Sequence, residues 1–366
     1  MLNRRHFLLS SGAVLAASPA WAEPSSSDEA SSSMARTLAK QQAYPASGIV
    51  AGLLDARGQR VVTQGTSDAD NSRLLDGDTV FDIGSLTKIF TALVLADNIV
   101  HGHMAMNDPL AKYLPPNVHV PDFQGQPITL LDLVTYSPGL PGWPADMPKL
   151  SQAPFPEYLT ERLYQALANT TLTVPPGTQY VYSNFGYGLL GLALAHHADT
   201  DFESLVISRI CRPLGMESTR ITLTPSMQAR KSPGHFKELT KVAGWDMPPA
   251  FAGAGALRST ANDLLKFLAA ATGVKHSSLA AAFAEMLKVE RQNDKPDTMV
   301  AAGWFITRAH GDRLIWKDGG VLGYSSLLGY SAVHRNGVVV LANGILSGDT
   351  WTLGKHLLNP EFPAPA

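Results

Sequence analysis

The stretch Phe81-Asp82-Ile83-Gly84-Ser85-Leu86-Thr87-Lys88 is the part of the sequence that decides the fold. Ser85 is the only serine with a lysine three residues later, and the apolar run 86–98 predicts a helix that starts at this serine. Side chains three residues apart on a helix lie about 5–6 Å apart at Cβ, so Lys88 is expected beside Ser85. A serine becomes a good nucleophile when a neighbour takes its proton, which a lysine does only where burial or another cation lowers its pKa. The alternative is a helix-capping serine next to a surface lysine.

A second pattern, Tyr182-Ser183-Asn184, follows a Pro-Pro-Gly sequence and precedes the apolar run 185–195. Because proline is excluded from a helix interior, the pattern is expected on a loop or at a helix start. A tyrosine phenol near two cations can relay a proton, and an asparagine amide can hold a substrate amide. A buried tyrosine and a capping asparagine are the alternative.

A third pattern, Lys317-Asp318-Gly319, is predicted to end a strand over 313–316 and is followed by Gly320 and Gly323. Glycines at such a place let a substrate backbone approach closely. The alternative is a hairpin turn with an exposed lysine. The occurrence of all three patterns in this order favours one shared active site over three unrelated local structures.

The sequence resembles the serine β-lactamase and penicillin-recognising superfamily, in its class C-like branch. That branch holds class C β-lactamases, D-alanyl-D-alanine carboxypeptidases and endopeptidases, and β-lactamase-like esterases. The resemblance runs from about Ile49 to Leu346, and beyond the three patterns it is carried by further segments: Asn107-Asp108-Pro109-Leu110, Pro176-Gly177, Arg212-Pro213-Leu214-Gly215-Met216, and Gly253-Ala254-Gly255-Ala256-Leu257-Arg258-Ser259-Thr260.

The resemblance implies a role for each residue of the three patterns. Ser85 would be acylated, and Lys88 and Tyr182 would handle its proton. The backbone N–H groups of Ser85 and Gly320 would form the oxyanion hole. The remaining positions would contact the substrate: Asn184, Lys317, Asp318, Gly319 and Gly320.

Two departures from the family pattern stand out. Asp318 stands where the family usually has a threonine or serine that helps to bind a substrate carboxylate. Tyr136-Ser137-Pro138-Gly139-Leu140 replaces a more usual His-Thr-Ser-Gly-Leu. The first departure leaves the substrate open and does not touch the acyl-transfer residues.

Hydrophobic patterning predicts an α/β (α+β) fold with one antiparallel sheet built from both chain ends, flanked by helices, and with a mainly helical region inserted. We expect residues 34–95 and 260–366 to form the sheet region and 96–259 the helical region of one catalytic unit, 34–360, with Ser85 at their junction. The expected strands are 48–54, 60–65, 303–307, 314–317, 325–330 and 338–341, and the expected helices include 130–135, 157–168, 185–197, 261–271 and 350–358.

The N-terminus predicts export to the periplasm. Arg4-Arg5, a short apolar stretch and Ala20-Trp21-Ala22 are typical of a signal peptide over residues 1–22. We expect the twin-arginine route, cleavage that leaves Glu23 first, and a flexible spacer over 23–33. An uncleaved anchor is the alternative. Without residues 1–22 the chain has 27 basic and 31 acidic residues, a net charge of −4, which predicts no nucleic-acid partner.

Other functional classes are disfavoured. The glycine pattern 186–191 matches a dinucleotide-binding motif but lies in a predicted helix, where glycines allow close packing. Histidines 101, 103, 196 and 197 lack the neighbours of a metal site, and lone Cys211 is expected to be a buried apolar residue. We therefore expect no cofactor and no metal.

The predicted function is that of an exported serine hydrolase acting on a small-molecule or peptide substrate through an acyl-enzyme. A D-alanyl peptide, a β-lactam and a simple ester all fit, and the oligomeric state is left open. A catalytically slow penicillin-binding receptor or scaffold on the same fold is the alternative.

Overall fold

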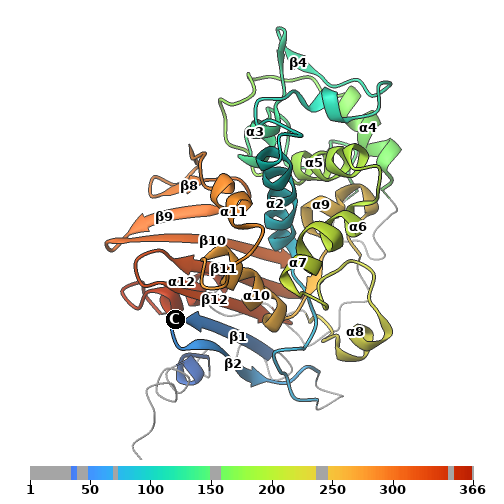
Figure 1. Cartoon of the computed structure of the whole chain (residues 1–366). Helices are drawn as coiled ribbons and strands as arrows, with labels where there is room; N and C mark the ends of the chain where they lie inside the picture. The colour runs from blue at the N-terminus through green and yellow to red at the C-terminus, as the bar shows by residue number, and fades with distance from the viewer. Residues whose placement is uncertain are drawn as a thin grey trace, which may run out of the picture.

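An eight-stranded antiparallel sheet forms one side of the molecule, and strands from both chain ends build it (Figure 1). The computed structural model describes residues 34–38, 48–68, 73–148, 158–235, 246–344 and 350–364. The strand order is β2-β1-β12-β11-β10-β9-β8-β7, so the N-terminal hairpin joins the sheet by pairing β1 with β12. The expected sheet is thereby confirmed. Its strands are β1 (Gly48–Asp55), β2 (Gly58–Gly65), β7 (Arg291–Gln292), β8 (Thr298–Val300), β9 (Phe305–Ala309), β10 (Asp312–Val321), β11 (Tyr324–Ser331) and β12 (Asn336–Ala342).

The central strands are apolar on both sides because helices cover both faces of the sheet. Helix α10 (Ala261–Ala271) packs with Leu268 over Gly337 of β12, and α12 (Thr350–Leu358) packs with Leu358 over Gly329 of β11. Gly337 pairs with Tyr330, the residue after Gly329, and neighbouring residues of a strand point to opposite faces. The two helices therefore lie on opposite faces, and the run from Gly337 to Ala342 is buried throughout.

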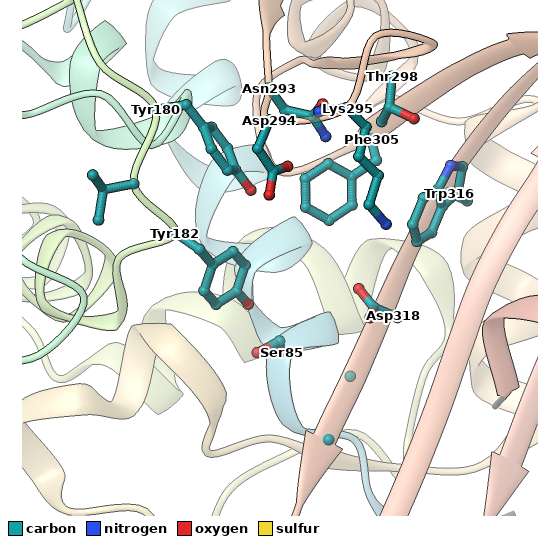
Figure 2. A pocket seen from close by; sticks show the side chains of 13 residues that line it. Ser85, Tyr180, Tyr182, Asn293, Asp294, Lys295, Thr298, Phe305, Trp316 and Asp318 are labelled. Carbon is teal, nitrogen blue, oxygen red and sulfur yellow. Dashed lines mark hydrogen bonds between the residues drawn. The ribbon is translucent and has the colours of Figure 1, made fainter.

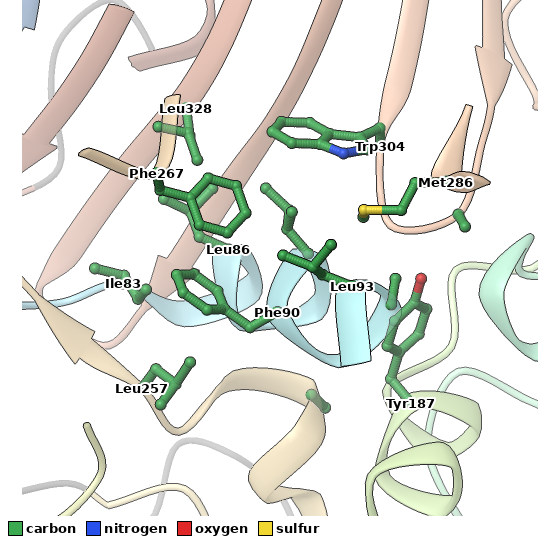
Figure 3. Packing of buried hydrophobic residues seen from close by; sticks show 14 of the residues in the cluster. Ile83, Leu86, Phe90, Leu93, Tyr187, Leu257, Phe267, Met286, Trp304 and Leu328 are labelled. Atoms are coloured by element: carbon green, nitrogen blue, oxygen red, sulfur yellow. The ribbon is translucent and has the colours of Figure 1, made fainter. Parts of the chain in front are cut away.

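The helical region is organised around α2 (Thr87–Val100), whose residues are buried as far as Asn98. Phe90 packs against Phe267 of α10 at a ring-centroid distance of 4.8 Å, and Figure 3 shows Leu86, Leu93 and Trp304 in the same core. A helix buried on all sides is held firmly, and Ser85 lies in the single turn that leads directly into it. Around α2 lie α3 (Leu130–Val134), α4 (Thr160–Ala168), α5 (Asn184–His197), α6 (Phe202–Val206), α7 (Arg212–Leu214), α8 (Pro225–Arg230), α9 (Ala252–Gly255) and α11 (Ala280–Met286).

Shorter elements connect these helices. Single-turn helical segments are η1 (Gly84–Leu86), η2 (Leu110–Tyr113), η3 (Ile207–Cys211) and η4 (Pro249–Phe251), and two small antiparallel pairs are β3 (Phe81–Asp82) with β6 (Arg258–Ser259) and β4 (Asp122–Phe123) with β5 (Gln126–Pro127).

The glycines of the 186–191 pattern serve helix packing. They lie inside α5, and a Cβ at Gly191 would come within 2.9 Å of the Gly253 Cα in α9. A Cβ at Gly188 would lie 2.8 Å from the Ala250 carbonyl oxygen. This is the close packing that the sequence favoured over a dinucleotide site.

Most expected elements occur where the sequence places them. The bounds of α10 and α12 match, α3 and α5 differ by one residue at one end, and the described part of the helix expected over 157–168 is α4. The strand expected over 303–307 is shifted to 305–309, and strands β7 and β8 were not predicted. Residues 1–33, with the predicted signal peptide and spacer, lie outside the described part.

The prediction that Lys317-Asp318-Gly319 ends a strand is wrong. All three residues lie inside β10, which continues to Val321 because Gly319 and Gly320 pair with Ser326 and Ser325 of β11. Among the described residues, no helix is both long enough and apolar enough to cross a membrane.

Candidate active site

Ser85 is held where the single turn η1 meets the C-terminal part of β10. Gly84 has a φ of +50°, and a Cβ on it would lie 2.9 Å from the Gly320 carbonyl oxygen. A Cβ on Gly319 would lie 2.3 Å from the Ile83 carbonyl oxygen. The two glycines thus let the turn and the strand touch backbone to backbone, and this contact places the nucleophile beside the strand.

Lys88 lies in the first turn of α2, three residues after Ser85, and is completely buried. Its Nζ is 3.0 Å from Ser85 Oγ, 2.7 Å from Asn184 Oδ1 and 2.6 Å from the Ala254 carbonyl oxygen. The last two atoms only accept hydrogen bonds, so they take two N–H groups and leave the third position of the nitrogen facing the hydroxyl. Burial, and then the nearby Lys317 ammonium, holds the pKa of Lys88 well below its usual range, against a smaller opposing effect of Asp318. A neutral Lys88 in this geometry presents its lone pair to the Ser85 proton.

Tyr182 and Asn184 reach the site from the start of α5. Ser183 is the N-cap, with its Oγ accepting from the Gly186 N–H at 2.9 Å, so the alternative of a capping asparagine is wrong. The Tyr182 ring lies between two amines, with Lys88 Nζ 5.0 Å and Lys317 Nζ 4.6 Å from its centroid. Burial raises the pKa of the Tyr182 phenol, while its hydrogen bond with Ser85 lowers it. The Asn184 oxygen accepts from Lys88, and the amide N–H₂ of Asn184 is left to donate to a substrate.

Lys317 is buried in β10, so the alternative of an exposed turn lysine is wrong. Its Nζ has no hydrogen-bond partner among the residues that the structure describes. It lies 3.7 Å from Asp318 Oδ1 and 4.1 Å from the Phe305 ring centroid. Burial lowers the pKa of Lys317 to about 8, and the Asp318 carboxylate acts in the opposite direction.

A pocket of about 610 Å³ opens in front of Ser85. Figure 2 shows the Ser85, Tyr182 and Asp318 side chains around it, and the Asp318 side chain is 51% exposed. A Cβ on Gly320 would meet no atom within 4 Å, so this strand segment borders open space. Of the predicted site residues, five line the pocket and three lie behind it. The lining residues are Ser85, Tyr182, Asp318, Gly319 and Gly320, and those not in the lining are Lys88, Asn184 and Lys317.

Part of the pocket wall was not predicted. Tyr180, Phe305 and Trp316 supply aromatic faces, and Val181 lies beside Tyr182. The connection between β7 and β8 adds Asn293, Asp294 and Lys295, and the start of β8 adds Thr298. No local motif marks these positions, since they meet only through the sheet. Tyr136 was visible only as part of the departure at 136–140, and its ring stacks on Tyr182 with centroids 4.7 Å apart.

Other candidate groups are accounted for by their surroundings. Gly102, between His101 and His103, has a φ of +74° just after α2 ends, as expected for a helix-ending glycine. Within the described ranges, no three His, Cys, Asp or Glu side chains are grouped as metal ligands. Cys211 is buried, which raises the pKa of its thiol to about 12. A buried thiol of this kind is a poor nucleophile.

Comparisons with known proteins identify a matching family and several relatives. The sequence model of the beta-lactamase family matches residues 34–351. The D-alanyl-D-alanine-carboxypeptidase/endopeptidase AmpH of Escherichia coli K12 is 34% identical over 199 residues, covering 52% of this chain and 48% of that protein. A beta-lactamase of Lysobacter lactamgenus is 27% identical over 232 residues, covering 62% and 56%. The chain thus spans about half the length of the curated relatives it matches.

Solved structures share the fold over most of their length. D-alanine carboxypeptidase AmpC from Burkholderia cenocepacia superimposes with a TM-score of 0.72 and 25% identity, covering 87% of this chain and 95% of that chain. A beta-lactamase/D-alanine carboxypeptidase from Yersinia pestis, complexed with citrate, gives a TM-score of 0.75 at 23% identity, covering 90% and 96%.

Proposed function

The chain belongs to the beta-lactamase family, in the class C-like branch of the serine β-lactamase and penicillin-recognising superfamily, and on that premise we propose that it is a serine hydrolase that forms an acyl-enzyme on Ser85. One observation carries the proposal. Lys88 Nζ lies 3.0 Å from Ser85 Oγ while its other two hydrogen-bond positions are occupied by atoms that only accept. A buried amine with a lowered pKa next to a hydroxyl is the arrangement that activates a serine.

The proposed reaction has two acyl-transfer steps. Ser85 Oγ attacks the substrate carbonyl, and its proton passes to Lys88, with Tyr182 next to both groups. The backbone N–H groups of Ser85 and Gly320 would bind the developing oxyanion. The proton then goes to the leaving group, which departs as an amine or alcohol. Water repeats the sequence on the ester, returning Ser85 to its hydroxyl form and releasing a carboxylic acid.

The charges in the pocket support a preference among amides and esters. Asp318 and Asp294 both line the pocket. Within the described residues, Asp318 pairs with Lys317 at 3.7 Å, which is too long for a hydrogen bond. A ligand carboxylate placed near Lys317 would also lie near Asp318. We therefore expect neutral esters or amides to be better substrates than β-lactams, which carry a carboxylate.

Intact-mass spectrometry tests the acyl-enzyme directly. The purified protein is mixed with a neutral ester, a D-alanyl peptide and a penicillin, and quenched in acid after milliseconds to minutes. A mass increase equal to the acyl group, absent in Ser85→Ala and decaying with turnover, is the expected result. Turnover without an adduct that also survives in Ser85→Ala would refute the mechanism. A permanent penicillin adduct with no turnover of any substrate would identify the slow receptor instead.

We also propose that the protein is exported to the periplasm through the twin-arginine route. Mass spectrometry of the periplasmic protein is expected to give a chain that begins at Glu23, because Ala20-Trp21-Ala22 offers small residues for cleavage. Replacing Arg4 and Arg5 by lysine should block export. Unchanged export of that variant would exclude the twin-arginine route.

A further inference from the structure

Tyr136 occupies a backbone position that usually belongs to glycine. It follows α3, where the Tyr136 N–H donates to the Leu133 carbonyl at 3.3 Å and the Ser137 N–H donates to the Asp132 carbonyl at 2.8 Å. These two bonds form the helix-ending motif in which the residue after the cap is left-handed, and Tyr136 has a φ of +56°. A side chain with a Cβ is strained there. A strained residue next to an active site calls for a reason in what its side chain does.

The Tyr136 side chain lies flat against the phenol of Tyr182. Its ring is fully buried and stacks on the Tyr182 ring at 4.7 Å and an interplanar angle of 27°. The Tyr136 carbonyl also accepts a hydrogen bond at 2.7 Å from the N–H of Val181, the residue before Tyr182. The Tyr136 carbonyl thus holds the chain segment that carries Tyr182, and the Tyr136 ring fixes the plane of the Tyr182 ring.

The same ring forms one wall of a cage around Lys317. The ammonium lies 4.1 Å from the Phe305 centroid, 4.6 Å from that of Tyr182 and 5.5 Å from that of Tyr136. In the described part of the chain it has no hydrogen-bond partner. A cation removed from water is stabilised by the faces of aromatic rings, so these three rings replace part of its lost hydration.

We propose that Tyr136 is a positioning residue, whose ring orients Tyr182 and, with Phe305, keeps Lys317 in its cationic form. The inference rests on the proposed function and adds to it a residue outside the three sequence patterns. The ring rather than the hydroxyl carries this role, since the Tyr136 hydroxyl has no hydrogen-bond partner among the described residues. Phenylalanine is therefore expected to replace Tyr136 and an aliphatic residue is not.

The charge of Lys317 depends on groups from every side of the cage. Asp318 on β10 favours the ammonium, and a protonated Lys88 on α2 would disfavour it. Asp294 and Lys295 are the further charged residues that line the pocket. Leucine in place of Tyr136 keeps the surroundings apolar and removes one aromatic face. The cation is then less stable, its pKa falls, and the alkaline limb of the activity profile moves to lower pH.

The test compares Tyr136→Leu with Tyr136→Phe in steady-state hydrolysis of a neutral ester from pH 5 to pH 10. We expect Tyr136→Leu to lose at least about tenfold in kcat with little change in KM, because a misplaced catalytic group slows chemistry more than binding. Its alkaline limb should move down by about 0.5 to 1 pH unit. Tyr136→Phe should keep the wild-type profile. Tyr158→Leu is the matched control, since Tyr158 is equally buried but packs on Phe251 outside the cage.

Three results would overturn the inference. They are equal pH–activity profiles for Tyr136→Leu and wild type, equal losses of kcat in Tyr136→Phe and Tyr136→Leu, or a shift of the alkaline limb in Tyr158→Leu as large as that in Tyr136→Leu. If Tyr136→Leu fails to fold, Phe305→Leu removes the nearest ring of the same cage and must move the alkaline limb in the same direction.

Wild type and Ser85→Ala are measured in parallel. An inactive wild type, or an active Ser85→Ala, would refute the proposed function, whereas Ser85-dependent turnover with unmoved profiles would refute only the role of Tyr136.

Discussion

Burial gives Lys88 a chemistry that the free amino acid lacks. A lysine in water has a pKa of about 10.4 and is protonated at neutral pH. Inside α2 its charge is disfavoured by burial and by Lys317, and a neutral amine can still donate its two N–H groups to Asn184 Oδ1 and the Ala254 carbonyl. A base must lose its proton before it acts, so activity rises as pH rises through the Lys88 pKa. Because that pKa is well below its ordinary value, this rise should be complete far below pH 10.

The first prediction concerns Ser85, Lys88 and Tyr182. Ser85→Ala should abolish turnover, and Lys88→Ala or Tyr182→Phe should lower kcat by about 10²- to 10⁴-fold, with a much smaller rise in KM, because positioned proton transfer acts in the transition state. Steady-state kinetics on a neutral ester measures this, and EDTA should have no effect. Full activity in Ser85→Ala would contradict the mechanism, and loss of activity on chelation would reveal a metal.

The second prediction concerns Asp318, whose half-exposed carboxylate lines the pocket. Two like charges about 4 Å apart repel by ~1 kcal/mol in water and ~4 kcal/mol at an intermediate dielectric, and about 1.4 kcal/mol is tenfold in rate. Asp318→Thr should therefore raise kcat/KM for a cephalosporin at least about tenfold relative to an uncharged ester. Asp318→Asn, which removes the charge without adding a hydroxyl, should give part of this gain. An unchanged ratio in both variants would mean that Asp318 does not set the preference.

At the scale of elements, the site depends on the contact between η1 and β10. The third prediction is that Gly319→Ala destabilises the protein by at least about 2 kcal/mol and lowers activity, because the new Cβ would meet the Ile83 carbonyl oxygen at 2.3 Å and Ser326 Oγ at 2.4 Å. Gly320→Ala is the matched control for stability, since its Cβ meets nothing within 4 Å. Thermal unfolding followed by circular dichroism compares the two. Equal melting temperatures would show that β10 can move away from the turn at little cost.

The same contact shows what the sequence could and could not predict. Local patterns predicted the bounds of α10 and α12 and brought Ser85, Lys88, Tyr182 and Lys317 together, because each pattern carries its own chemistry. The sequence did not predict that β10 continues through Lys317-Asp318-Gly319, since two glycines read as a turn unless a partner strand is known to lie alongside. The wall residues Phe305 and Asp294 were missed for a related reason. They lie at the pocket only because of the order in which the strands pair, and the spacing of residues along the sequence does not encode that order.

At the scale of the whole molecule, the two ends of the chain depend on each other. The sheet that carries Lys317 is completed by β1, which pairs with β12 from Ile49↔Ala342 to Leu54↔Gly337. Helix α10, from the middle of the chain, then packs with Leu265 against Gly52 of β1. Sequence-distant segments must therefore assemble together before the wall of the pocket is complete, and a polar residue at the end of β12 joins several of them.

That residue is Asn343, which is fully buried and joins four segments of the chain. Its Oδ1 accepts from the Gly48 N–H at 2.6 Å, its Nδ2 donates to the Ser67 carbonyl and Ser232 Oγ, each at 2.8 Å, and its own carbonyl accepts from the His235 N–H at 2.9 Å. The fourth prediction is that Asn343→Ala costs about 3 kcal/mol or more, because the buried Gly48 N–H loses its partner, and the Ser67 carbonyl and Ser232 Oγ each lose one hydrogen bond and keep the one between them. The melting temperature should fall by about 5–10 °C. Asn262→Ala, which removes an exposed amide that binds Asp78, should change stability by less than about 0.5 kcal/mol. If the two variants melt at the same temperature, the chain ends are held together by the strand pairing alone.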